Sequence, residues 1–328
     1  MRRRNFLMSL AVVASGWPIE GRAAKPPVRI GFLCAGSATS QNSIDTIRTI
    51  KQSLSRQGLV ESRDYEFEDR YAAGDYDRFP ALARELSQAG VSIVLANTIA
   101  SARAAQQLSP SVQVVMIGIN NPVDVGLIAS LARPGHNTTG MSVLAEDLTP
   151  KLLDLARELL PSAKSIAALF NPSNPSNPVL LERLQKAAGS AGMTVAAVEL
   201  KSASGLETAF AGIAASRPDL LVLIPDLGTT VDLSENIASF ARDRKLPSIS
   251  IVPDYARLGG LMGYGVPSRD LFTKAAYFLK RILDGANAGD LPVEQPTRVE
   301  LVVNLKIAKV LGVDVPATMV TRADEVID

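Results

Sequence analysis

The sequence has little of what enzyme and metal sites are built from: 328 residues contain a single histidine, His136, and a single cysteine, Cys34. Familiar zinc sites need several such ligands at short spacings, and neither an HExxH nor a CxxC motif occurs. A GxSxG motif, a phosphate-binding loop and a GxGxxG segment after a strand are also missing. His136 stands in "RPGHNTTG" (133–140), a context typical of a solvated turn residue. We therefore expect no catalytic residue, no metal site and no cofactor.

Neither sign of charge predominates. The chain has 34 basic and 33 acidic residues, and without residues 1–23, which hold four arginines and one glutamate, the balance is 30 to 32. A surface for nucleic acid or anionic lipid needs clustered positive charge, so neither partner is expected. No run beyond the N-terminal segment reaches the roughly 20 apolar residues needed to span a bilayer. Cys34 lacks a disulfide partner and lies in an apolar run, which indicates a buried strand residue.

The N-terminal segment "MRRRNFLMSLAVVASGWPIEGRA" (1–23) has the three parts of an export signal. Three arginines precede an apolar stretch, and Gly21-Arg22-Ala23 provides a small-x-small cleavage site. Two export routes are open, because the arginines fit both an ordinary positive region and a twin-arginine pattern that lacks its usual Ser or Thr. In either case the sequence predicts a periplasmic protein whose mature chain starts after residue 23.

Apolar runs alternate with helical patterns along the rest of the chain. Aliphatic residues dominate, since 47% of residues are hydrophobic but only 5% are aromatic. Continuous aliphatic strands that alternate with helices are typical of parallel sheets covered on both faces. The order occurs twice, with strands predicted at 28–33, 65–71, 91–97 and 112–119, and again at 165–170, 193–200 and within 205–226 and 237–252. The pattern predicts two doubly wound α/β lobes.

The segment between the two halves and the C-terminal segment predict a hinge. A helix over 145–163 is expected to begin at Thr149-Pro150, a favourable N-cap and first-turn pair. The C-terminal segment, with a helix over 269–285, returns after both halves and supplies further crossings. We expect one lobe from 28–143 plus about 267–295, and the other from 144–266 plus about 296–328.

Small polar residues follow the predicted strands. In open α/β sheets ligands bind beyond the carboxyl ends of the strands, so two facing lobes would bring these residues together around a cleft. The segments are Ala35-Gly36-Ser37, Asn97-Thr98, Asn120-Asn121-Pro122, Asn171-Pro172-Ser173 and Pro225-Asp226. Asn171-Pro172 opens a run of three Asn-Pro pairs, which either forms one edge of the cleft or only ends a strand with a stiff turn.

Individual candidates have two interpretations each. Asp226 could pair with a ligand ammonium group or cap a helix that begins near Thr229. Ser37 and Thr98 could hold a ligand carboxylate or act as N-caps. Tyr264, in "GGLMGYG", could stack on an aromatic ligand or pack between lobes.

Several segments together resemble a known bacterial family, the substrate-binding proteins of ABC transporters. They are "RIGFL", "AAGDYDRFPALARELSQAGVSIVLANT", "NPVDVGLIASLARPGHNTTGMS", "LFNPSNP", "GGLMGYG", "RILDGANAGDLPVEQPTRVELVVNLKIAKVLG" and "RADEVID". The family resembles type I periplasmic binding proteins, and some members are linked to tryptophan, phenylalanine or tyrosine uptake. The resemblance implies two lobes that trap a ligand and deliver it to a membrane permease.

The resemblance also carries over site residues, with two departures. Matching positions give Ser37, Thr98, Asn121, Asn171 and Asp226 as cleft candidates, to which the strand ends add Asn97, and the "GGLMGYG" segment Tyr264. Many relatives have glycine where His136 stands. An acidic residue is often found where this chain has Asn121, and an amide cannot supply that charge.

The expected function is binding without chemistry. The sequence predicts a solute-binding protein of an ABC importer that captures a small polar metabolite with an apolar part, such as an aromatic or branched amino acid. A permease and its ATPase are the implied partners. A ligand-sensing receptor for a membrane histidine kinase is the alternative, and an exported enzyme is a further one.

Overall fold

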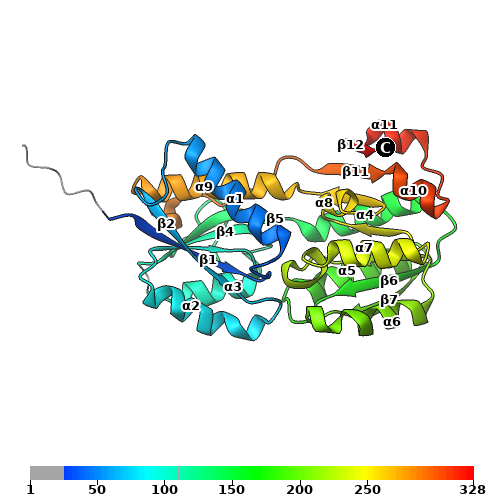
Figure 1. Ribbon diagram of the computed structural model, residues 1–328, viewed down its shortest axis with the longest axis horizontal. Coiled ribbons are helices and arrows are strands. Elements are labelled where there is room, and N and C mark those ends of the chain that lie inside the picture. Colours follow the sequence, from blue (N-terminus) through cyan, green and yellow to red (C-terminus); the bar gives the residue numbers. More distant parts are fainter. Residues whose placement is uncertain (1–25, 110) are drawn as a thin grey trace, which may run out of the picture.

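The structure is a computed structural model that describes residues 26–109 and 111–328, so the predicted export signal at 1–23 lies outside the described residues. Two α/β lobes lie side by side along the long axis of the molecule (Figure 1). Each is built on its own sheet, one of five strands and one of seven. The two-lobed α/β architecture expected from the sequence is confirmed.

The first lobe has an all-parallel sheet in the order β2-β1-β3-β4-β5. Its strands are β1 (Val28–Cys34), β2 (Tyr65–Tyr71), β3 (Ile93–Ala96), β4 (Gln113–Asn120) and β5 (Thr138–Val143). Helices α1 (Gln41–Arg56) and α9 (Ser268–Leu283) share one buried core with the sheet. The short helix η1 (Tyr76–Arg78), α2 (Phe79–Gln88) and α3 (Ile99–Gln106) share the core on the other face.

The second lobe has seven strands in the order β12-β11-β10-β9-β8-β6-β7. They are β6 (Ser165–Phe170), β7 (Thr194–Glu199), β8 (Leu220–Leu223), β9 (Ser248–Ser250), β10 (Met262–Gly265), β11 (Glu300–Asn304) and β12 (Glu325–Ile327). All neighbours pair in parallel except β10 and β11, which are antiparallel.

Helices cover both faces of this second sheet as well. One core includes residues of α4 (Ala145–Leu159), α5 (Asn177–Ser190), α10 (Leu305–Leu311) and α11 (Ala317–Arg322). The other includes α6 (Leu206–Ser216), α7 (Ser234–Asp243) and α8 (Asp254–Arg257). Short turns η2 (Ala203–Gly205), η3 (Leu227–Val231) and η4 (Ala288–Asp290) complete the chain, and η3 is a π-helical turn.

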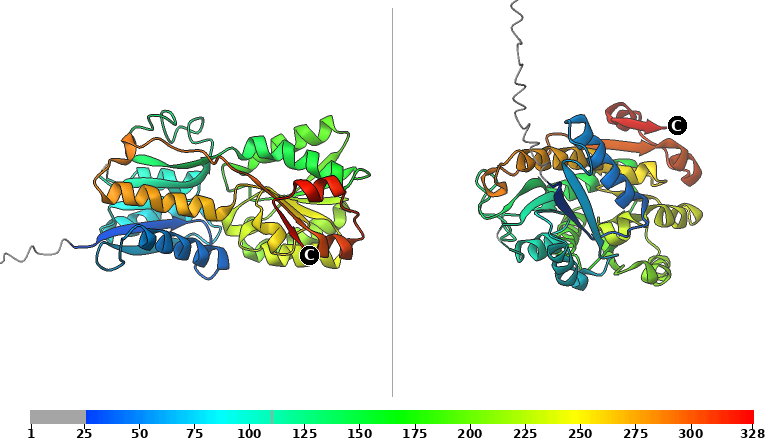
Figure 2. Two further views of the ribbon diagram at one scale, coloured as in Figure 1. Left: turned by 90° about the horizontal axis from the view of Figure 1, so that it is seen from above. Right: turned by 60° about the vertical axis from the view of Figure 1, so that its left-hand side comes forward.

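The chain crosses between the lobes three times: from β5 to α4, from β10 to α9, and from η4 to β11. Figure 2 shows α9 lying along the first lobe, followed by the extended crossing to β11. The strands of the first lobe, and β6 to β10 of the second, each point their carboxyl ends toward the other lobe, whereas β11 and β12 run in the opposite direction. The facing edges create the setting for a site between the lobes.

The start of α4 differs from the expectation. The helix begins at Ala145, and Thr149 and Pro150 lie inside it. The side chain of Asn120, at the end of β4, accepts a hydrogen bond from the Ala145 N–H at 3.0 Å. The Thr149 hydroxyl instead donates to the carbonyl of Ala145 at 2.9 Å. A long-range cap from the end of β4 therefore replaces the expected local cap. No local sequence pattern could indicate it.

Candidate functional site

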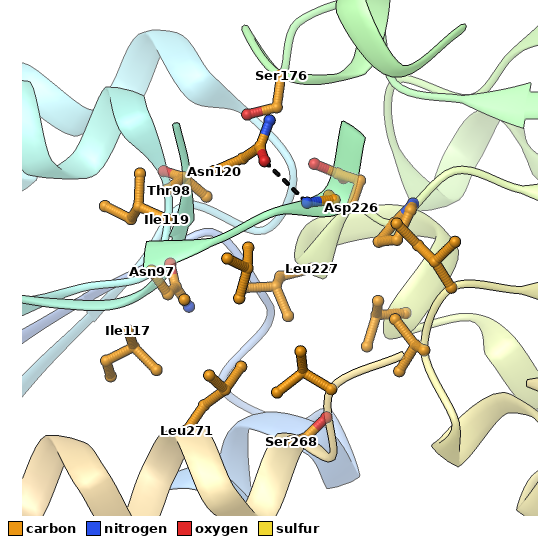
Figure 3. Close-up of a pocket in the computed structure, with 18 of the residues that line it drawn as sticks. Asn97, Thr98, Ile117, Ile119, Asn120, Ser176, Asp226, Leu227, Ser268 and Leu271 are labelled. Atoms are coloured by element: carbon orange, nitrogen blue, oxygen red, sulfur yellow. Dashed lines mark hydrogen bonds between the residues drawn. The ribbon is translucent and has the colours of Figure 1, made fainter. Parts of the chain in front are cut away.

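A cavity of about 170 Å³ lies between the two lobes. It is bounded by the residues after β3 and β8, by β4, and by the first residues of α3, α4, α5 and α9. In Figure 3, Asn97, Thr98, Ile117 and Ile119 line one side, and Ser268 and Leu271 of α9 approach from another. Both lobes thus contribute walls to one cavity.

Most of the cavity wall is apolar. Aliphatic side chains of both lobes contribute to it, among them Ile117 and Ile119 of β4, Leu271 of α9, Leu180 of α5, Leu227 at the start of η3 and Ile251 after β9. Phe272 adds the only aromatic ring to the part of the wall that the structure describes. Such a wall favours a ligand with an apolar body, because burying apolar surface contributes about 25 cal/mol per Å².

Asn97 and Thr98 form the polar end of β3. The Asn97 side chain is already held, since its oxygen accepts from the Ala35 N–H at 3.1 Å and its amide donates toward the Cys34 sulfur at 3.2 Å. Thr98 is the N-cap of α3, where it forms a reciprocal capping box with Ser101. Both residues also line the cavity. Thr98 thus caps α3 and lines the cavity, with its hydroxyl already bonded to Ser101.

Asp226 is the only charged residue among the described residues that line the cavity, and it is 1% exposed. Its carboxylate accepts four hydrogen bonds, from the Tyr76 hydroxyl (2.6 Å), the Asn174 amide (3.0 Å), the Asn171 amide (3.1 Å) and the Thr229 hydroxyl (2.7 Å). A carboxylate offers about four acceptor positions. The chain itself occupies all of them, and the side chain makes no capping bond to a backbone N–H of η3.

The three Asn-Pro pairs build the support of Asp226. Asn171 is fully buried and does not line the cavity, and its oxygen accepts from the Ser173 N–H at 3.0 Å. Asn177 accepts from the Asn171 N–H and donates to the carbonyl of Pro225, both at 2.9 Å. The stiff turn after β6 thus fixes the residues on either side of Asp226 through side-chain amides.

Three other candidates lie away from the cavity wall. Ser37 donates its backbone N–H to Asp232 of the second lobe at 2.7 Å. Asn121 has a left-handed backbone (φ 45°), and its amide donates to Asp124 at 2.7 Å. Tyr264 packs against the core of the second lobe. None of the three is among the residues that line the cavity.

Sequence reasoning missed Tyr76, because it lies at no strand end. It included Asn174 in the Asn-Pro run as a possible edge of the cleft but did not single it out. It also passed over Asn120 in favour of its neighbour Asn121, although Asn120 lines the cavity. The Asn-Pro repeat was a usable signal for Asn174. Nothing in the sequence near Tyr76 indicates a partner 150 residues away.

Burial perturbs three titratable groups around the site. It raises the pKa of the Cys34 thiol to about 11 and that of Asp232 to about 6. Burial and the neighbouring Asp226 raise the pKa of the Tyr76 hydroxyl well above its usual value. Tyr76 therefore keeps its proton and donates a hydrogen bond to Asp226 throughout the physiological pH range.

Within residues 26–109 and 111–328 no group of three or more His, Cys, Asp and Glu side chains is arranged to hold a metal ion. In the same part of the chain no helix combines the length and apolar character needed to cross a bilayer.

The profile of one protein family, described as ABC transporter substrate binding protein, matches residues 37–327. The chain belongs to this family. The resemblance drawn from the sequence is thereby confirmed, and proteins of this family bind substrates. A curated relative, a tyrosine-binding protein of Clostridioides difficile (strain R20291), is 24% identical over 261 residues, which cover 79% of this chain and 74% of the relative.

Solved structures of other proteins share the fold. A conserved domain protein of Vibrio cholerae has a TM-score of 0.82 at 23% identity, covering 91% of this chain and 99% of its own. An ABC domain from Streptococcus pneumonia, solved in complex with L-Trp, has a TM-score of 0.79 at 23% identity, covering 91% and 100%. The myo-inositol binding protein of Caulobacter has a TM-score of 0.60 at 11% identity, covering 86% and 95%. The predicted fold class, type I periplasmic binding protein-like, is confirmed.

Proposed function

We propose that this substrate-binding protein is the periplasmic component of an ABC importer, which captures a small metabolite between its lobes and delivers it to a permease and its ATPase. The observation that carries this proposal is the cavity, whose walls come from both lobes. A ligand that contacts both walls binds the closed state better than the open state and so shifts the population toward closure. The moving bodies are residues 28–143 with 267–295 and residues 144–266 with 296–328.

The charge of the cavity favours a neutral or zwitterionic ligand. Asp226 receives its four hydrogen bonds from neutral donors, so its negative charge is not cancelled by a cation. A second anion held about 6 Å away would cost about 3 kcal/mol at an effective dielectric constant of 20. An amino acid with an aromatic or branched side chain fits both this charge and the apolar wall. The relatives named for tyrosine and solved with L-Trp support the same class.

Polar recognition falls to the groups that remain available. Beside Thr98, the N–H groups of Ile99 and Ala100 at the start of α3 donate to no other group in the described part of the chain. Such N–H groups suit a ligand carboxylate. Ser176 and Ser268 add hydroxyls to the cavity wall. An ammonium group that bound Asp226 would have to displace one of its four donors.

A thermal-shift screen of residues 24–328 against amino acids, purines and sugars tests the proposal. We expect aromatic or branched amino acids to raise the melting temperature. Ser268→Trp should abolish the shift by filling the cavity, whereas Ser190→Trp, on the exposed end of α5, should not. A shift that survives Ser268→Trp would place binding outside the cavity. Uptake of the labelled ligand by cells with and without the chain then distinguishes delivery to a permease from sensing.

A further inference from the structure

We propose that Tyr76 and Asp226 form a latch between the lobes, so that Asp226 positions the lobes against each other and does not serve as the ligand's counter-ion. The inference rests on the closure described under the proposed function. It assigns to Asp226 a role different from the ligand contact expected from the sequence.

The Tyr76 side of the latch is held by the first lobe. Its ring packs edge-to-face on Phe79, with ring centroids 5.3 Å apart at 89°. The residue is 8% exposed and belongs to the core that α2 and α3 share. Its hydroxyl reaches across to Asp226 at 2.6 Å, the short distance of a charge-assisted bond. Within the described residues this is the only hydrogen bond of the hydroxyl.

The Asp226 side is held by the second lobe. Three of its four donors, Asn171, Asn174 and Thr229, come from the same lobe and stay with it when the lobes separate. Its backbone N–H donates to the Thr230 hydroxyl at 2.8 Å, which fixes the main chain as well. The fourth donor alone crosses between lobes. Opening would therefore leave Asp226 without one of its four donors and the Tyr76 hydroxyl without its acceptor.

Neighbouring contacts make the latch a continuous junction. The Ser37 N–H donates to Asp232 at 2.7 Å, which again joins the first lobe to the second. Beside it, Gly74 and Gly228 approach so closely that a Cβ on Gly228 would lie 2.5 Å from the Gly74 Cα. These contacts use only groups of the chain. They contribute to closure whatever ligand occupies the cavity, and the apparent ligand affinity scales with the closed fraction that they set.

Pulsed electron–electron double resonance on the unliganded chain measures this closed fraction directly. Spin labels at Ser87→Cys on α2 and Ser190→Cys on α5 report the separation of the lobes, because both positions are exposed and native Cys34 is buried. Tyr76→Phe removes the latch hydroxyl and keeps the ring. Tyr71→Phe is the matched control, because the Tyr71 hydroxyl donates to Asp69 at 3.3 Å inside the first lobe.

The expected result is a shift toward longer separations in Tyr76→Phe. A hydrogen bond to a charged group corresponds to a fall in the closed-to-open ratio of about tenfold to a hundredfold. Tyr71→Phe should keep the wild-type distribution. An unchanged distribution in Tyr76→Phe, or a wild-type chain without a closed population, would overturn the latch. Failure of the proposed function would look different, as a chain with an intact latch that no metabolite stabilises.

Discussion

Replacing Gly228 by alanine should hold the lobes apart while leaving each lobe folded. The added Cβ would lie 2.5 Å from the Gly74 Cα, and 2.6 Å from both the Gly74 nitrogen and the Ala35 oxygen. All three are backbone atoms of the first lobe, so no side chain can rotate away. Gly228 has no positive φ, and alanine is therefore tolerated by its own backbone.

The size of the effect follows from the movement that the Cβ demands. Ordinary contact begins near 3.4 Å, so the lobes must separate by about 1 Å at this point. The bond from Tyr76 to Asp226 would lengthen from 2.6 Å to about 3.6 Å, and that from Ser37 to Asp232 from 2.7 Å to about 3.7 Å, beyond hydrogen-bonding range. Each bond to a charged acceptor contributes about 1.5–3 kcal/mol. The closed state would lose about 3–6 kcal/mol, which corresponds to at least a hundredfold in ligand affinity.

Isothermal titration with a ligand from the thermal-shift screen, together with the melting temperature of the unliganded chain, measures both sides of this prediction. We expect a large loss of affinity with little change in melting temperature. Gly189→Ala is the control, because its Cβ would meet nothing within 4 Å and it lies in α5 of the second lobe. Wild-type affinity in Gly228→Ala would refute the reasoning, because the two glycines could then not be in contact when ligand binds.

Three further predictions concern the same junction. Burial raises the pKa of Asp232 to about 6, so the folded chain holds this proton more tightly than the unfolded chain, whose value is about 3.9. The contribution of Asp232 to the free energy of unfolding should therefore rise as pH falls from about 7 to 4. In urea titrations over this pH range, the free energy of unfolding of the wild type relative to that of Asp232→Asn should rise as pH falls. Cys34, with its pKa raised to about 11, should stay unmodified by iodoacetamide at pH 8 until the chain unfolds; rapid labelling of the folded chain would contradict its burial. Asn174→Ala removes one donor from Asp226 and should lower the free energy of unfolding by about 1.5–3 kcal/mol in urea titrations, whereas a neutral result would mean that water replaces the amide.

The fold was largely predictable because its signals are local and repeated. The aliphatic run at 165–170 coincides with β6, and "YEFEDRY" with β2. Signals that depend on distant partners were lost. The start of α4 is capped by Asn120 from another strand, and the short C-terminal elements α11 and β12 have too few residues for a clear period.

The site was predictable only at the level of the strand ends. Asn97, Thr98 and Asp226 do line the cavity, because parallel strands bring their carboxyl ends to one edge. The same rule cannot tell which neighbouring side chain points inward, and at the end of β4 it is Asn120 that lines the wall. It also cannot show how many partners a carboxylate has. The four donors to Asp226 come from three separate segments, and only the folded chain brings them together.

A crystal structure of the chain with the metabolite that most raises its melting temperature would test the central claim most directly. We expect the ligand in contact with both lobes, beside Asn97 and Thr98 on one side and Leu180 on the other, with the bond from Tyr76 to Asp226 intact. A ligand that contacts one lobe alone, or that lies outside the cavity, would contradict it.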